Sequence, residues 1–287
     1  MELRRVGVED FDEVLPLLLK FRNRRMSRDD WHRMLFSYPW PAERRHGYGY
    51  YEDGALLGFL GTIFSQRQLA GRTETVCSFS SWVVEERARG TSVLMVRPLL
   101  KDLEGVTVVG YTPAPTTCAV FQRFGFRPFE TTRLVLAPLP PLDSVRRSLG
   151  ASAILSPERI RERLTGPEAE IFRDTIPCPR VRHLLLTRGQ ERCYLVARLD
   201  RPHRIRAAEL LYIGNLPLFW ELRALAHAAF LRSMGALALL VDGRFALGRR
   251  VRAAWPLPRV RLFRPSRPEI TPDMIDGLYS ELLTLRE

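Results

Sequence analysis

The sequence contains very little lysine. Only Lys20 and Lys101 occur among 287 residues, so arginine carries almost all of the formal net charge of +12. Such a charge suits an acidic partner: nucleic acid, anionic lipid or a phosphorylated cofactor. The arginines are scattered without a long like-charge run, and no helix-turn-helix, aromatic RNA-binding or zinc motif occurs. We therefore interpret the charge mainly as a compositional bias and rank nucleic-acid binding last, whereas a phosphorylated cofactor needs only a few arginines.

Cysteine and long apolar runs are scarce as well. The four cysteines show no C-x-x-C spacing and the five histidines no H-x-x-x-H pair, so we expect no metal site and no disulfide framework. Residues 1–5 lack the apolar stretch of a signal peptide. The most apolar stretch, 217–241, is interrupted by charged side chains and is too polar to span a bilayer. These absences predict a cytoplasmic protein with no membrane span.

The remaining composition is typical of a folded globular chain, with 46% apolar and 26% charged residues. The length favours two domains.

The first half predicts a strand, two helices, three strands, a helix, a strand, a helix and a strand, and a proline cluster follows within 137–143. We predict domains at 1–136 and 181–287, joined at 137–180 by a proline-rich linker with short helices. The second half again predicts three strands, a helix and a strand, which favours a mixed α/β (α+β) fold with two similar domains in tandem.

Several helix boundaries are predicted from capping residues and prolines. Asp10 and Glu13 have the spacing of a capping box, as do Ser27 and Asp30. Residues 91–103 have helical spacing, with a kink expected at their internal proline, Pro98. A last helix is predicted to begin at Thr271-Pro272 and to carry Ile275, Leu278 and Leu282.

The most informative stretch is 80–92, which predicts a strand, a short glycine-containing loop and a helix start. Such a loop offers unpaired backbone N–H groups and the positive end of a helix dipole, which together favour a phosphate or pyrophosphate. Arg87 and Arg89 add multidentate cationic donors. The alternative is an ordinary strand-to-helix turn with solvated arginines.

This stretch resembles the pyrophosphate loop of the GNAT acyltransferase superfamily, whose pattern is Q/R-x-x-G-x-G/A. The chain has R-A-R-G-T-S at 87–92, with serine in the last position, and it matches the family's later aromatic-x-x-x-G-F signature at 119–126. The two motifs lie in the expected order, and the resemblance covers about residues 1–136. It implies a mixed central sheet flanked by helices and the use of acetyl-CoA or another acyl-CoA.

The resemblance also implies how the coenzyme is held. In the family, the fourth and fifth strands splay apart around pantetheine, which would lie against residues 82–84. The amides of 88–92 would hold the pyrophosphate, and Arg87 or Arg89 could reach the ribose phosphate. The implied cofactor-binding residues are Trp82, Val83, Val84, Arg87, Ala88, Arg89, Gly90, Thr91, Ser92, Thr116 and Phe121.

The sequence departs from the family at two positions. Phe121 stands where many members have a tyrosine that protonates the leaving thiolate, and Thr116 stands where asparagine is common, although its hydroxyl could still cap the helix. Two general bases are candidates: Glu85, which could equally be a solvated loop acid, and Tyr111, which could equally be a packed strand aromatic. A water chain could replace both.

The sequence therefore predicts an acyl-CoA-dependent N-acyltransferase, most simply an acetyltransferase, acting on an amine acceptor that it does not identify. An amino sugar, an amino acid, a polyamine and a protein amine all remain open, as does the oligomeric state. The alternative, motivated by Phe121 and by the second half, is a non-catalytic coenzyme A-binding or scaffold protein.

Overall fold

The computed structural model describes residues 2–21, 26–40, 45–137, 142–246, 248, 251 and 253–284. They form two compact units. Unit 1 comprises the residues up to Phe129, Val260–Ile275 and the segment that begins at Tyr279; unit 2 comprises Glu130–Arg259 and Asp276–Leu278. In the described part of the chain, no helix has the length and apolar character needed to cross a bilayer.

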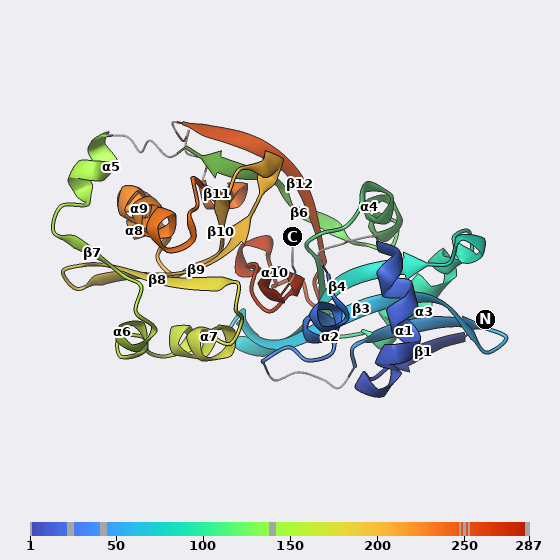
Figure 1. The fold of residues 1–287 in the computed structure, drawn as a ribbon. Coiled ribbons are helices and arrows are strands. Elements are labelled where there is room, and N and C mark those ends of the chain that lie inside the picture. Colours follow the sequence, from blue (N-terminus) through green and yellow to red (C-terminus); the bar gives the residue numbers. More distant parts are fainter. Residues whose placement is uncertain are drawn as a thin grey trace. The chain divides into compact units, whose positions relative to one another are not determined.

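Unit 1 is built on a mixed sheet (Figure 1). Its strands, in sheet order, are β1 (Glu2–Val6), β2 (Gly47–Glu52), β3 (Ala55–Leu69), β4 (Arg72–Val84), β5 (Thr107–Gly110) and the end of β12 (Ala254–Arg264). Neighbouring strands are antiparallel except β4 and β5, which are parallel.

The helices of unit 1 pack on this sheet. They are α1 (Phe11–Leu18), α2 (Arg28–Leu35), α3 (Val96–Asp102), α4 (Pro115–Gln122) and α10 (Glu281–Thr284). Helices α1 and α2 contact β3, while α3 and α4 contribute to the buried cluster that contains Tyr48, Phe64 and Phe79. This packing of the helices on the sheet places α4 and the turn after β5 next to the end of β4.

Several local predictions are confirmed in unit 1. Asp53-Gly54 forms the β2–β3 turn. Both residues have a positive φ, 49° at Asp53 and 81° at Gly54, and glycine adopts such a value without strain. Ser27 caps α2: its hydroxyl accepts from the Asp30 amide at 3.1 Å, and the Asp30 carboxylate accepts from the Ser27 amide at 3.1 Å.

Three helix predictions are wrong. Asp10 does not pair with Glu13; its carboxylate accepts a hydrogen bond from the Gly7 amide at 2.7 Å and so caps the short 3₁₀ turn Val8–Asp10. Pro98 does not kink a helix, because α3 begins at Val96 and Pro98 falls in the first turn, where its missing N–H has no intrahelical partner anyway.

The third wrong prediction concerns the helix expected to begin at Thr271. Only a 3₁₀ turn, Pro272–Met274, forms there. The chain then bends, with a positive φ of 54° at Tyr279, and α10 begins only at Glu281. A helix cannot run through a left-handed residue, so the predicted apolar stripe is divided between two turns.

Unit 2 repeats the sheet pattern of unit 1. Its strands, in sheet order, are β7 (Ala151–Ile154), β8 (Val181–Arg188), β9 (Glu191–Asp200), β10 (Ala207–Ile213), β11 (Ala238–Asp242) and β6 (Arg127–Leu136). Strands β10 and β11 are parallel, and the other described pairs are antiparallel. The helices are α5 (Leu142–Arg147), α6 (Pro157–Arg161), α7 (Pro167–Thr175), α8 (Leu216–Glu221) and α9 (Arg223–Met234).

Each unit takes its closing strand from the other half of the chain. Strand β6 follows α4 of unit 1 but pairs with β11, while residues 262–264 of β12, which follow unit 2, pair with β5. The compact units therefore exchange strands across the predicted boundary, and separate folding of 1–136 and 181–287 stays a prediction. The prolines of that boundary, 138–141, lie outside the described residues.

Candidate functional site

The site begins where β4 and β5 part. Their parallel pairing runs from Val76 and Thr107 to Phe79 and Gly110, and β4 then continues to Val84 against β3 alone. The predicted divergence of these strands is therefore confirmed. A bulge in β4 accompanies it, with a positive φ of 58° at Ser81, which is a strained value for a side chain other than glycine.

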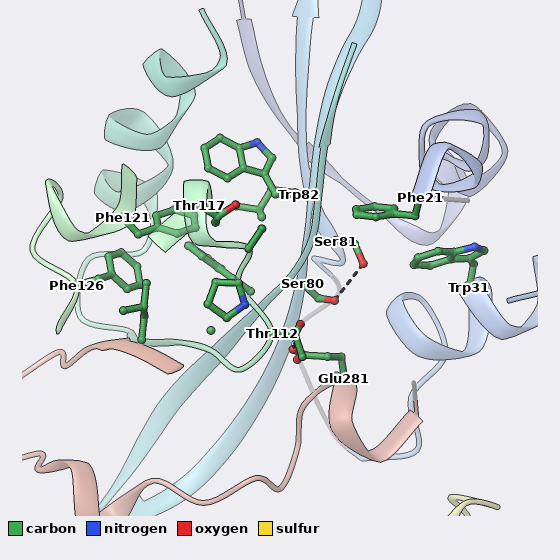
Figure 2. A pocket seen from close by; sticks show the side chains of 16 residues that line it. Phe21, Trp31, Ser80, Ser81, Trp82, Thr112, Thr117, Phe121, Phe126 and Glu281 are labelled. Carbon is green, nitrogen blue, oxygen red and sulfur yellow. Dashed lines mark hydrogen bonds between the residues drawn. The ribbon is translucent and has the colours of Figure 1, made fainter. Parts of the chain in front are cut away.

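A pocket of about 330 Å³ opens at this divergence. Figure 2 shows Trp82, Phe121 and Phe126 on one side of the strand ribbons and Phe21, Trp31 and Glu281 on the other. The lining residues come from the 3₁₀ turn Leu19–Phe21, α2, β3, β4, the end of β5 with the turn after it, α4 with the turn after it, the end of β12, and α10. They are Phe21, Trp31, Leu60, Phe79, Ser80, Ser81, Trp82, Gly110, Thr112, Pro113, Ala114, Thr117, Phe121, Phe126, Leu262 and Glu281.

Phe121 belongs to the aromatic wall of this pocket. Its ring is 4% exposed, and its centroid lies 5.5 Å from that of Phe79, 5.2 Å from Trp82 and 4.9 Å from Phe126. The Phe121 ring therefore packs among the other rings of this wall and carries no O–H; its place beside a thioester stays a prediction.

A groove of about 870 Å³ adjoins the pocket, with which it shares Phe21, Trp82 and Thr117. Its lining residues are Lys20, Phe21, Trp82, Val83, Val84, Glu85, Glu86, Arg89, Ser92, Thr116, Thr117 and Val120. The groove therefore runs along the free end of β4, from the arginine-containing loop to the point of divergence.

No protein-family model matches the chain, and no curated protein matches its sequence. Solved structures do match it. A GCN5-related N-acetyltransferase from Anabaena variabilis is 11% identical, with a TM-score of 0.62 over 93% of this chain and 73% of its own. One from Kribbella flavida is 14% identical (TM-score 0.60; 92% and 70% of the two chains), and Eis1 from Mycobacterium abscessus is 16% identical (TM-score 0.52; 93% and 74%).

The chain has the GNAT fold. The matches extend over both units, so the GNAT likeness reaches well beyond residues 1–136, where the sequence motifs lie. At these identities the likeness concerns the fold alone.

The structure brings most of the predicted cofactor residues of this GNAT fold to one place. Six of them line the groove and Phe121 lines the pocket; the six are Trp82, Val83, Val84, Arg89, Ser92 and Thr116. The other four belong to the same loop but not to the described lining: Ala88 is buried in the core, Arg87 and Gly90 are exposed, and the Thr91 hydroxyl accepts a hydrogen bond from Tyr50 at 3.1 Å. Their cofactor roles stay predictions.

The amides of this loop are partly used within it. Those of Ala88, Arg89 and Thr91 donate to carbonyl groups of the loop at 3.0, 3.3 and 3.2 Å. No such bond is found among the described residues for the amides of Gly90 and Ser92. Binding of a phosphate by loop amides would therefore depend first on these two.

Trp82 supplies a further unsatisfied donor. It lines both the groove and the pocket, and its indole Nε1 is buried with no hydrogen-bond partner among the described residues. A buried N–H without an acceptor costs free energy, so a site that provides an acceptor when a ligand binds is favoured. A carbonyl group of a ligand lying along β4 would fit this donor.

The structure places neither candidate base on the pocket wall. Glu85 lies in the groove, where its carboxylate is 2.5 Å from the Lys20 ammonium group. Tyr111 is 1% exposed and packs in the core, with its ring centroid 5.9 Å from that of Phe129 and 5.5 Å from the Arg261 guanidinium. Their catalytic roles stay predictions that this geometry does not strengthen.

Thr116 does not cap α4, contrary to the sequence prediction. Ala114 occupies the N-cap and Pro115 the first helical position, for which the fixed φ of proline is suited. Thr116 therefore lies inside the first turn, where its exposed side chain lines the groove.

Sequence reasoning missed Glu281. This carboxylate is 1% exposed and lines the pocket, where it accepts hydrogen bonds from the hydroxyls of Ser78 at 2.9 Å and Thr112 at 3.0 Å. Ser78 lies 203 positions earlier in the chain, so only the tertiary fold brings these residues together. The one available signal was a carboxylate among apolar neighbours in a predicted buried helix face.

Proposed function

We propose that the protein transfers an acyl group, most simply acetyl, from acyl-coenzyme A to an amine. One observation carries this proposal: a long groove along the free end of β4 opens into a pocket at the divergence of β4 and β5. A donor with a long thin arm and a reactive end, and a separate acceptor, would meet at that opening. The GNAT fold supports the assignment by analogy.

The groove residues fit coenzyme A chemically. The backbone of Trp82–Val84, free of β5, would pair with the pantetheine amides, and the buried Trp82 Nε1 would donate to a carbonyl oxygen. Arg89 and the amides of Gly90 and Ser92 would hold phosphate oxygens by charge-assisted hydrogen bonds. The coenzyme supplies an acyl carbon activated as a thioester.

The pocket walls would position the reaction and exclude water from it. Phe79, Phe121 and Phe126 surround the pocket end of the groove with apolar rings. Phe121 can orient the acyl group but cannot give a proton to the sulfur. Because a free thiol has a pKa of about 8.5, the sulfur can leave as a thiolate without a general acid, at a lower rate.

The first test is the affinity for coenzyme A of Gly90→Glu and Gly90→Ala, measured by calorimetry. A side chain built at Gly90 meets no atom within 4 Å, so both variants should fold. The glutamate should weaken binding by about 100-fold or more, because its charge would repel the pyrophosphate at about 4 Å or less. The alanine should bind like the wild type, with one coenzyme A per chain. Equal affinities for all three proteins would contradict the proposal.

The second candidate function is a coenzyme A-binding protein without transferase activity, and Phe121 is the observation that favours it. Acetyl-CoA turnover with a panel of amines separates the two. Release of coenzyme A that depends on an amine and is lost in Gly90→Glu supports the transferase. Tight binding without turnover of any amine would support the binding protein.

A further inference from the structure

One end of the unit 2 sheet carries exposed apolar side chains among exposed arginines. We propose that this end binds the surface of an anionic lipid bilayer. Its apolar side chains would enter the interface between headgroups and acyl chains, and its arginines would pair with the anionic headgroups. The inference does not depend on the proposed acyl transfer, which concerns unit 1.

Three segments of the chain meet at this end. The loop 201–206 joins the end of β9 to the start of β10, and β10 pairs in parallel with β11, so the residues before β11 lie beside that loop. Strand β6 is antiparallel to β11, and the Ala137 amide after β6 donates to the Ala253 carbonyl before β12 at 2.9 Å. The start of β12 therefore reaches the same end. We call the segments 201–206, 231–237 and 253–259 the basic end.

Large apolar side chains are exposed on all three segments of the basic end. Their exposed fractions are 57% for Trp255, 52% for Leu237, 46% for Ile205 and 44% for Leu231. None of them lines the pocket or the groove. Apolar side chains that stand on neighbouring loops can each enter a bilayer interface, where tryptophan is enriched, without a partner surface of matching shape.

The charge of the basic end has one sign. Its three segments contain five arginines and neither aspartate nor glutamate. Arg201, Arg204 and Arg232 are exposed, and none of the three forms an ion pair with a described acid. Arginine is a multidentate donor to phosphate and carboxylate oxygens, and each arginine held near an anionic leaflet strengthens binding about fivefold.

Backbone hydrogen bonds fix the loop that carries the exposed Ile205. The Ile205 amide donates to the Pro202 carbonyl at 2.9 Å. The Leu237 amide donates to the Arg206 carbonyl at 2.7 Å, which ties the loop to the residues after α9. Because the loop is fixed before it meets a surface, binding costs little conformational entropy.

Other anionic or apolar partners suit this end less well. A nucleic acid would pair with the arginines, but its sugars and phosphates would cover Ile205 and Leu237 without an apolar contact in return. A second copy of the chain placed symmetrically on this end would set arginines against arginines, and like charges repel. An anionic bilayer suits both kinds of side chain at once.

The test is flotation of the full chain with vesicles of phosphatidylcholine, either alone or mixed with phosphatidylserine. The wild type should bind the mixed vesicles at least about 30-fold more tightly, because several arginines act together. Added salt should weaken this binding. Arg204→Gln combined with Arg232→Gln should weaken it about 25-fold. Both side chains are exposed, so the variant should fold.

The matched control is Arg159→Gln combined with Arg163→Gln, which removes the same charge from other exposed positions of unit 2. The Arg163 carbonyl accepts a hydrogen bond from Arg192, near the start of β9, whereas the basic end adjoins the last residue of that strand. The control should bind the mixed vesicles within about threefold of the wild type, because salt screens charges that are remote from the contact.

The apolar contribution has its own readout. Trp255 is exposed, whereas the other four tryptophans are buried or half-buried. Mixed vesicles should shift its fluorescence to shorter wavelength, brominated lipid should quench it, and Trp255→Phe should lose both responses while still binding. Ile205→Ser combined with Leu237→Ser should weaken binding about tenfold, because less apolar surface leaves water.

Four results would overturn the inference. They are equal binding to the two kinds of vesicle, equal losses in the arginine variant and its control, no quenching of Trp255 in the bound protein, and tighter binding to a DNA duplex than to the mixed vesicles. Self-association that Ile205→Ser with Leu237→Ser abolishes would also overturn it, because the basic end would then belong to a contact between two copies of the chain.

Discussion

The two units share one sheet pattern but treat its central divergence differently. In each, a parallel pair follows an antiparallel meander and a closing strand arrives from the other half of the chain. In unit 1, β4 runs into an exposed arginine-containing loop, and α3 begins only at Val96. In unit 2, β10 ends at Ile213, and Asn215 caps α8 at once by accepting from the Leu218 amide at 3.1 Å.

The two units also differ in what fills the space beside their parallel strands. In unit 2, the tight junction brings Leu218 and Phe219 into the core at 2% and 0% exposure, whereas the corresponding junction of unit 1 borders a groove. The comparison shows that the point where two parallel strands separate does not form a binding site by itself. The loop between the strand and the next helix must also be long enough to keep that helix from filling the space between the strands.

Unit 2 also contains a buried ion cluster. Arg133 donates to Asp200 at 2.9 Å and to Glu209 at 3.0 Å, and Arg198 donates to the other oxygen of Glu209 at 2.7 Å. These side chains are 3–7% exposed. Their mutual pairing stabilises the interior of unit 2 only while the cluster is complete, because each buried charge lies next to an opposite one.

The largest expected effect tests this contrast. Glu209→Gln would leave two buried arginines without one of their counter-charges, so the free energy of unfolding should fall by about 3–5 kcal/mol in urea denaturation. Under conditions where the variant is folded, its coenzyme A affinity should equal that of the wild type. Arg188→Gln, which breaks partly exposed pairs with Glu191 and Glu221, is the control and should cost little, because exposed ion pairs contribute little stability. A folded variant that had lost coenzyme A binding would show that the groove of unit 1 depends on this ion cluster.

The next prediction concerns the loss of folding stability as the pH decreases. Burial, and then the nearby charge of Arg182, lower the pKa of His183 in unit 2 to about 4. Its unfolded pKa is about 6.5, so stability is full above that pH and falls by about 3 kcal/mol as the pH decreases towards 4, because the unfolded chain binds the proton first. In unit 1, hydrogen bonds from Arg5 and Tyr48 lower the pKa of Asp102 to about 2; its contribution is lost only below about pH 4.

Unfolding measured between pH 7 and 4 checks this order. Replacing His183 with glutamine should reduce the slope above pH 4.5, and the remainder is due to His46 and His227, whose pKa values burial also lowers. His203→Asn, at an exposed position with a φ of 49° that asparagine tolerates, should leave the slope unchanged. An unchanged slope in His183→Gln would show that other groups are responsible.

The smallest effect concerns the open divergence of unit 1. Phe121→Tyr adds one O–H at the pocket wall and should raise kcat about tenfold, or about 1.4 kcal/mol in barrier height, if protonation of the sulfur limits turnover. The KM for acetyl-CoA should stay the same. Phe126→Tyr, a change at a neighbouring ring of the same wall, is the control. Equal rates for Phe121→Tyr and the wild type would mean that the sulfur needs no acid.

Local signals predicted much of unit 1. Turn glycines and a capping serine located the β2–β3 hairpin and α2, and an R-x-x-G pattern drew attention to the loop that borders the groove. These features depend on residues within a few positions of one another, so the sequence contains them directly.

The remainder depends on long-range contacts. Strand β12 was missed because Pro256 and Pro258 argue against a strand, although the residues that pair with β5 lie beyond them, at 262–264. The burial of Arg133 could not be foreseen, since its partners lie in other strands. Glu281 was missed for the same reason: its hydroxyl partners, Ser78 and Thr112, lie 203 and 169 positions away in the chain.

The exchange of closing strands has a consequence for biosynthesis. Unit 1 is complete only when Val260–Ile275 and the segment from Tyr279 have joined residues up to Phe129. Glu130–Arg259 must be translated first, which takes on the order of ten seconds at about 5–20 residues per second. Throughout that interval β5 is an edge strand with unpaired hydrogen-bonding groups, the kind of edge that invites misplaced pairing. The pocket, with Glu281 on its wall, therefore cannot form until Val260–Ile275 and the segment from Tyr279 have been made and have joined the rest of unit 1.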